Sequence, residues 1–232
     1  MAGSNSAWIA VAVGAAIAAT PACAETPREL LTQAGFVDRD RSVALARIDR
    51  AAAVAGQALR ASPQDQDAAI VQALANGYRA KLLGNRGQAI GARKQYEALV
   101  LRYPRNAEAQ AALGAWHVGV IAKLGRFVGR AAAGAQKAVG YAALDRSVAL
   151  GGNRAMFAGL AGLLRLELDP EDRRGRELVE MASRAPAPTA VDMIVRRAAV
   201  AVMVPLKAGD AQQVQALADR LLPFGQIADQ RG

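Results

Sequence analysis

The 232-residue sequence has few of the residues on which disulfide frameworks, metal centres and histidine-based catalysis depend. It contains one cysteine, Cys23, and one histidine, His117. One cysteine excludes a disulfide scaffold, and a metal site or nucleophilic pair that uses histidine would depend on His117 alone. The carboxylates show no cluster with the spacing of metal ligands. We therefore expect no metal, no cofactor and no catalytic centre, and we interpret His117 as a packed or solvent-facing side chain.

Aromatic residues are also scarce. They make up 4% of the chain, whereas hydrophobic residues make up 53% and charged residues 21%. Alanine supplies much of the hydrophobic content, and small residues suit closely packed helices better than sheets rich in Val, Ile, Thr and Tyr. The composition predicts an all-α protein and excludes a disordered polyampholyte.

Acidic residues are outnumbered by basic ones, 20 Asp and Glu against 29 Lys and Arg, for a formal net charge of +9. Such an excess can attract nucleic acid or anionic lipid. The arginines are scattered among acids, however, and an Ala- and Arg-rich chain is also what a GC-rich genome encodes. We do not expect nucleic acid as a partner, although a cytoplasmic polyanion binder stays an alternative.

An uncharged apolar run, Trp8–Ala19, precedes the sequence Thr20-Pro21-Ala22-Cys23-Ala24. Small residues at Ala22 and Ala24 fit a signal-peptidase site, which predicts a secretory signal peptide over 1–24 and a periplasmic location. The run is shorter than the roughly 20 apolar residues of a membrane span. Membrane contact is expected only if this segment stays as an anchor or is lipidated at Cys23.

Three similar turns recur along the remaining chain, each with a basic residue shortly before a glycine: Gly84, Gly125 and Gly209. The first two are 41 residues apart and the last two 84, or two periods of 42. A fourth turn is then expected near 167. There the sequence reads as a helix stop followed by a start, with Asp169 as N-cap and Pro170 at the first helical position. A repeat of this length predicts stacked helical units.

Helix starts are indicated by a capping oxygen three residues before an acid, at Thr26, Ser62 and Thr189. Apolar residues then recur at spacings of three and four, as at Ala109, Leu113, Trp116 and Val120, which favours helix over strand. Starts and stops together predict helices over 27–34, 41–61, 65–83, 87–102, 107–124, 128–150, 153–168, 170–185, 189–207 and 210–222. We expect five antiparallel hairpins that stack to bury their apolar stripes within one domain, 25–232.

The segment Tyr103–Gly114 resembles the junction of tetratricopeptide (TPR) repeats, with Pro104 ending one unit, Asn-Ala-Glu-Ala opening the next, and a Leu-Gly pair at the matching place. In that family small residues let the paired helices approach, a role that falls here on Ala75, Ala92 and Gly114, with Tyr96 as the larger packing residue. The period near 42 exceeds the family's roughly 34 residues, so the chain resembles a divergent member.

A narrower resemblance covers about 60–185. Leu113–His117, the long helix that follows and the partner helix end at Leu144–Leu150 are similar to two TPR-like groups: the periplasmic T component of TRAP transporters and the regulators of microtubule dynamics. The resemblance implies a superhelical stack of helices that binds a partner or a small apolar ligand without catalysis.

In TPR-like stacks the first helix of each hairpin lines the concave surface. Carried over to this sequence, the resemblance implies that the binding residues are Gln72, Asn76, Arg79, Glu108, Trp116, Arg165 and Arg196. Such a groove would be mildly positive and would favour an acidic peptide or a carboxylate. An aromatic residue at helical spacing is usually core, so Trp116 is either a packing residue or a stacking platform.

Four acidic residues lie within 167–172, and two neighbouring carboxyl groups can act as general acid and base in catalysis. Glu167, Asp169, Glu171 and Asp172 fall at a predicted helix end and helix start, so capping explains them. We therefore expect a non-catalytic cell-envelope adaptor that binds a protein or peptide segment. The alternative is a ligand-binding accessory of a solute transporter, which requires an enclosed apolar pocket near Trp116.

Overall fold

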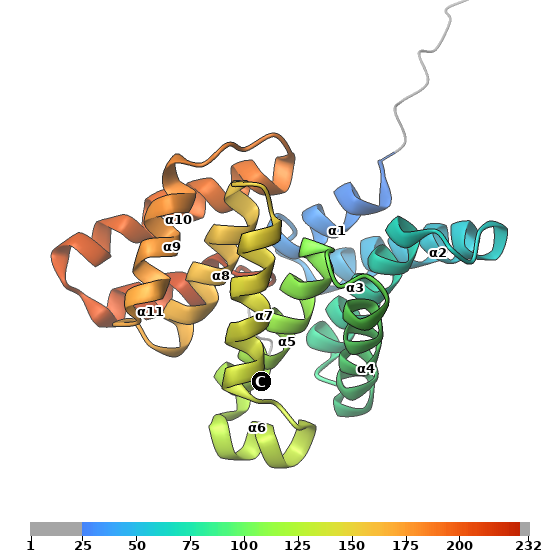
Figure 1. Ribbon diagram of the computed structural model, residues 1–232, viewed down its shortest axis with the longest axis horizontal. Helices are drawn as coiled ribbons and strands as arrows, with labels where there is room; N and C mark the ends of the chain where they lie inside the picture. The colour runs from blue at the N-terminus through green and yellow to red at the C-terminus, as the bar shows by residue number, and fades with distance from the viewer. Residues whose placement is uncertain (1–24, 228–232) are drawn as a thin grey trace, which may run out of the picture.

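The computed structural model describes residues 25–227, and over this range the protein is all-α, as the composition predicts (Figure 1). The predicted signal peptide lies outside the described residues. The helices are α1 (Pro27–Phe36), α2 (Arg41–Ala61), α3 (Gln66–Leu83), α4 (Arg86–Arg102), α5 (Ala107–Leu124), α6 (Arg126–Ala133), α7 (Lys137–Leu150), α8 (Ala155–Leu168), α9 (Arg173–Arg184), α10 (Ala190–Ala208) and α11 (Ala211–Leu221). Within this range no helix has the length and apolar character to cross a membrane.

Two of the predicted capping boxes start helices as expected. The side chain of Thr26 accepts from the backbone N–H of Glu29, and the Glu29 carboxylate accepts from the backbone N–H of Thr26 at 2.7 Å. Thr189 and Asp192 form the same reciprocal pair at the start of α10. Each box satisfies backbone N–H groups that a helix start leaves without a partner.

Two other predicted starts are wrong. Ser62 ends α2, and Asp65 is the N-cap of α3, where it accepts from the N–H of Ala68 at 3.0 Å. Likewise Asp169 ends α8, and Asp172 caps α9 with a 2.6 Å bond from the N–H of Gly175. In both cases the acid three residues further on is itself the cap, because a carboxylate accepts from the N–H groups of the first turn.

The recurrent glycines end helices, as the repeat predicts. Gly84, Gly125 and Gly209 have φ angles of 63°, 77° and 72°, a region that favours glycine. The turn near 167 has the expected spacing but a different conformation, because α8 ends at Asp169 in an extended conformation.

The predicted helix over 128–150 is two helices. Gly134 breaks it with a φ of 73°, and the backbone N–H of Gly134 bonds to the carbonyl of Arg130. Arginines of α4 complete the end of α6: Arg86 Nε donates to the carbonyl of Ala132 at 2.8 Å, and Arg93 Nη1 donates to that of Ala133 at 2.7 Å. The break is therefore stabilised by a distant helix, which local sequence patterns do not reveal.

Successive helices pack against one another along the chain except α6 and α7, and α5 packs on α7 across the inserted α6. Gly114 lies at this α5–α7 crossing, where a Cβ atom would meet Leu144 Cγ at 2.7 Å and the carbonyl of Gly140 at 2.9 Å. Glycine thus permits the close approach that the TPR resemblance implies for Gly114. The predicted hairpin of the helices 107–124 and 128–150 is present as the pair α5 and α7.

The segment after α11 returns to the first helices. Phe224 is buried among residues of α1–α3, its ring meets that of Tyr78 edge to face at a centroid distance of 4.9 Å, and its N–H donates to the carbonyl of Gly35 at 2.7 Å. Gln226 Nε2 donates to the carbonyls of Gly35 and Asp38 at 3.1 Å. The end of the described chain therefore closes onto its beginning.

Candidate functional site

The predicted binding residues of α3 contact the helices on either side of it. Asn76 Nδ2 donates to Gln95 Oε1 of α4 at 3.0 Å, and the guanidinium of Arg79 pairs with the carboxylate of Asp49 of α2. Gln72 is half-buried and lies against Gly56 of α2, where a Cβ atom would meet its Oε1 at 3.2 Å. These side chains link α2, α3 and α4.

Glu108, at the start of α5, is bonded to the first helix. Arg28 of α1 donates to the carboxylates of both Glu108 and Asp67, the latter from Nε at 3.1 Å. The arginine therefore joins α1 to α3 and α5. Glu108 is half-buried in this contact and its charge is matched.

Trp116 is half-buried between α5 and α4, and its indole N–H donates to the carbonyl of Ala89 at 2.8 Å. The guanidinium of Arg93 lies 5.6 Å from the centre of its ring. The neighbouring His117 is 2% exposed and its Nδ1 accepts from the N–H of Gln136 at 3.2 Å. Burial, together with the charge of Arg93, lowers the pKa of His117 to about 4, so the ring is neutral at pH 7.

The two remaining predicted residues have different environments. Arg165 is 5% exposed, bonds to Asp145 at 2.7 Å, lies 3.6 Å from Asp172, and covers the ring of Tyr141 at 3.9 Å from its centre. Arg196 is exposed on α10. The structure therefore places six of the seven predicted residues in several inter-helix contacts, and Arg79 and Arg165 are each paired with an acid of a neighbouring helix.

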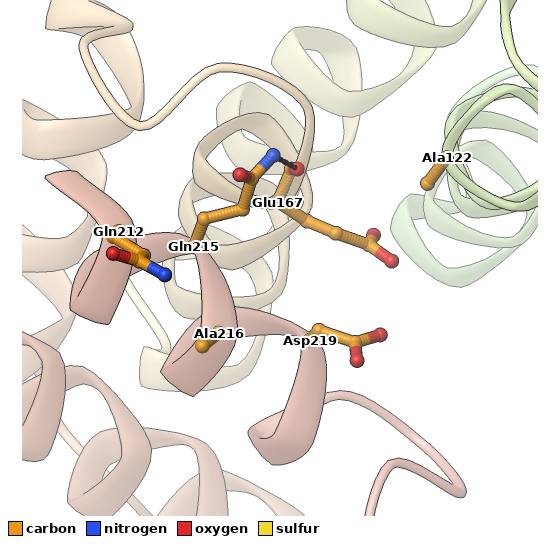
Figure 2. A pocket seen from close by; sticks show the side chains of 6 residues that line it. All are labelled: Ala122, Glu167, Gln212, Gln215, Ala216 and Asp219. Carbon is orange, nitrogen blue, oxygen red and sulfur yellow. Dashed lines mark hydrogen bonds between the residues drawn. The ribbon is translucent and has the colours of Figure 1, made fainter. Parts of the chain in front are cut away.

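An open cleft of about 370 Å³ lies elsewhere, between the end of α5, the end of α8 and α11. Figure 2 shows the residues that line it, which are Ala122, Glu167, Gln212, Gln215, Ala216 and Asp219. Gln215 Nε2 donates to the backbone carbonyl of Glu167 at 2.8 Å, so α11 satisfies one of the last carbonyls of α8. The carboxyl groups of Glu167 and Asp219 point to the same side of the cleft (Figure 2).

Glu167 has an unusual protonation equilibrium. Burial raises its pKa to about 7, and the charge and hydrogen bonding of Asp219 act in the same direction, while Lys81 opposes them. One of its oxygens, Oε2, is buried and accepts no hydrogen bond from the described protein atoms. At neutral pH a fraction of the molecules therefore carries a proton on this side chain.

Two of the helix ends that the 42-residue repeat predicts line the cleft, and the end of α3 lies near it. Lys81 lies in the last turn of α3, Ala122 in that of α5 and Glu167 in that of α8. The ammonium of Lys81 donates to the carbonyl of Pro223 at 2.9 Å, which places its charge within reach of Glu167 and Asp219. The ends of α3 and α8 therefore contribute charged groups, Lys81 and Glu167, that interact with Asp219 of α11.

The chemistry of this cleft is suited to binding polar groups. Two carboxyls and two side-chain amides can accept from and donate to a partner, and the carboxyls favour a cation. Within residues 25–227, no set of three or more His, Cys, Asp or Glu side chains is arranged to hold a metal ion. The sequence predicts a capping role for Glu167 and no role for Asp219, because no local pattern links residues on α8 and α11.

Comparisons of the chain with protein-family models, with curated proteins and with solved structures found no match.

Proposed function

We propose that this protein is a non-catalytic, TPR-like adaptor of the cell envelope that binds an extended segment of a partner protein. The observation that carries the proposal is the open, carboxyl- and amide-lined cleft between α5, α8 and α11 (Figure 2). The stack of successive helices and the Tyr103–Gly114 segment support the TPR-like part of the proposal. The apolar run Trp8–Ala19 supports export.

The cleft favours a basic side chain, not the acidic group expected from the sequence. Arg79 and Arg165 are paired with Asp49 and Asp145, so their charges are already matched. In the cleft, Asp219 is exposed and Glu167 has a buried oxygen that accepts no hydrogen bond from the described protein atoms. Lys81 lies near both carboxyls, but its ammonium donates to the carbonyl of Pro223. A lysine or arginine of the partner would donate to these carboxyls, and Gln212 would bond the backbone of an extended segment.

The small-ligand alternative has less support. It requires an enclosed apolar pocket near Trp116, but the indole N–H of Trp116 is used by Ala89 and its ring is covered by Arg93. Trp116 lines neither the cleft of Figure 2 nor the second open cleft, which is lined by Gln213, Ala216, Leu217 and Arg220. Open clefts at helix ends suit a peptide better than an apolar small molecule.

A peptide-display selection against the purified full chain tests the proposal. We expect the selected peptides to share a lysine or arginine, and we expect Asp219→Asn to weaken the best peptide about tenfold in fluorescence anisotropy, because one charge-assisted bond is lost. Glu171→Gln, an exposed acid outside the cleft, is the matched control. Equal affinity of wild type, Asp219→Asn and Glu171→Gln would refute the assignment of the cleft.

A charge-swap measurement makes this test specific. Replacing the peptide's basic residue by glutamate should abolish binding to wild type, and Asp219→Lys should restore part of it, because the new pair has complementary charges. A merely structural effect of Asp219 would give no such rescue.

A further inference from the structure

Helix α6 is the part of the described protein that lies furthest from the packed helices at the lower edge of Figure 1, beyond the ends of α5 and α7. It displays large apolar side chains to solvent: Phe127 is 85% exposed and Val128 57% exposed. Leu124, just before it, is also exposed. A single exposed apolar residue is ordinary on a protein surface, but three within five positions at a protruding tip are a patch that needs an explanation.

Helix α6 is held to the rest of the fold by two arginines of α4. Arg86 and Arg93 of α4 donate to the carbonyls of Ala132 and Ala133 at its C-terminal end, and the N–H of Gly134 closes its last turn on Arg130. Because its final carbonyl groups have partners, the helix holds Phe127 and Val128 outward. It has no need to unfold before it meets an apolar phase.

The charge around α6 has one sign along the chain. No Asp or Glu occurs between Glu108 and Asp145, and the basic residues of that stretch are Lys123, Arg126, Arg130 and Lys137. Arg130 and Lys137 are exposed. All four lie in α6 or within three or four residues of its ends, so the apolar tip is surrounded in sequence by positive charge.

We propose that α6 and its flanking residues 123–137 form a docking surface for a bilayer that contains anionic lipids. Phe127, Val128 and Leu124 enter the interface, and the exposed Arg130 and Lys137 contact lipid phosphates. A bilayer fits this surface because exposed apolar side chains and exposed basic residues occur together on α6 and its flanks, and an interface that contains anionic lipids accommodates both. This surface is separate from the cleft between α8 and α11 and does not depend on the function proposed for it.

Hydrogen exchange measured by mass spectrometry on the full chain tests this surface. We expect vesicles of phosphatidylcholine and phosphatidylglycerol in a 7:3 ratio to slow exchange in peptides that cover 123–137 at least severalfold, and pure phosphatidylcholine vesicles to have little effect. The slowing should diminish in 0.5 M NaCl, because salt screens the attraction. The readout is local, so membrane attachment through residues 1–24 does not contribute to it.

Matched variants distinguish binding through this surface from non-specific adsorption to vesicles. Phe127→Ser and Arg130→Glu should each abolish most of the protection of 123–137. Leu101→Ser, which removes an equally exposed apolar side chain (83%) from α4, and Arg197→Glu, which reverses an exposed charge on α10, should retain it. Unchanged exchange of 123–137 with anionic vesicles, or equal protection in Phe127→Ser and Leu101→Ser, would overturn the proposal. The exposed patch on α6 would then be explained by a protein partner.

Discussion

Glu167 at the end of α8 and Asp219 on α11 place their carboxyl groups on the same side of one cleft, although they are far apart in the sequence (Figure 2). Burial makes Glu167 harder to ionise, and the charge and hydrogen bonding of Asp219 add to the effect. Lys81 of α3 acts in the opposite sense. Because these groups come from three different helices, the pKa of Glu167 depends on the packing of α3, α8 and α11.

Glu167 makes stability depend on pH. Its pKa is about 7 in the folded chain against an ordinary 4.5, so the folded state keeps a proton that the unfolded chain loses between these values. The contribution of Glu167 to the stability of the folded state is fully present below pH 4.5 and is lost as the pH rises through 7. Glutamine stays neutral at every pH, so Glu167→Gln avoids the cost of burying a carboxylate at high pH. The free energy of unfolding of the variant minus that of wild type should therefore be about 1–3 kcal/mol larger at pH 8 than at pH 4.5.

Urea unfolding at the two pH values measures this difference. Glu171→Gln changes an exposed acid in the turn after α8 and should show no comparable pH dependence. If Glu167→Gln differs from wild type equally at pH 4.5 and pH 8, the carboxyl of Glu167 ionises normally in the folded protein.

His117 should remain neutral down to strongly acidic pH. Burial and Arg93 lower its pKa to about 4 from an ordinary 6.5, so the unfolded chain binds a proton that the folded chain does not. This stability contribution is present above pH 6.5 and is lost as the pH falls through 4. Because His117 is the only histidine, its ring protons give an unambiguous NMR titration, and a midpoint near 6.5 in the folded protein would contradict the buried position.

Arg165 should matter for stability in a way that Arg196 does not. Arg165→Met removes the cation between Asp145 and Asp172 and uncovers the ring of Tyr141. We expect a loss of about 2–4 kcal/mol in the free energy of unfolding, since the variant removes a buried cation and leaves the mostly buried Asp172 without it. Arg196→Met, on an exposed side chain, should stay within about 0.5 kcal/mol of wild type. Similar small effects of both variants in urea unfolding would argue against the buried contact.

The closure between the end of α11 and the first helices should carry a large share of the stability. Phe224→Ala leaves a cavity beside Tyr78 and is expected to cost about 3 kcal/mol. Phe127→Ala makes the same chemical change on the exposed tip of α6 and should alter the free energy of unfolding by less than about 0.5 kcal/mol. Thermal and urea unfolding of the two variants provide the comparison, and equal midpoints would show that the last segment does not hold the fold together.

Local patterns predicted much of the secondary structure. Thr26 and Thr189 start helices through their capping boxes, and Gly84 and Gly209 end helices because glycine tolerates a positive φ. The errors at Ser62 and Asp169 arose where two candidate caps stand three residues apart, since the same oxygens suit a helix end and a helix start. The break at Gly134 was missed because arginines of α4 help to stabilise it.

The candidate site was much less predictable. Arg79 and Arg165 are polar residues on helices that a TPR resemblance assigns to a groove, yet their charges are matched by Asp49 and Asp145 from neighbouring helices. Whether an arginine faces a partner or an internal acid depends on how neighbouring helices are placed. No spacing along one helix contains that information.

The amino-acid sequence alone determined the helical state, most helix boundaries and the roughly 42-residue recurrence, because these depend on backbone preferences and on hydrogen bonds within a few residues. The tertiary structure decided that α5 packs on α7, that Phe224 closes the chain onto Tyr78, and that Glu167 meets Asp219. These outcomes depend on distances between side chains remote in the sequence, and burial then sets the ionisation of the groups brought together.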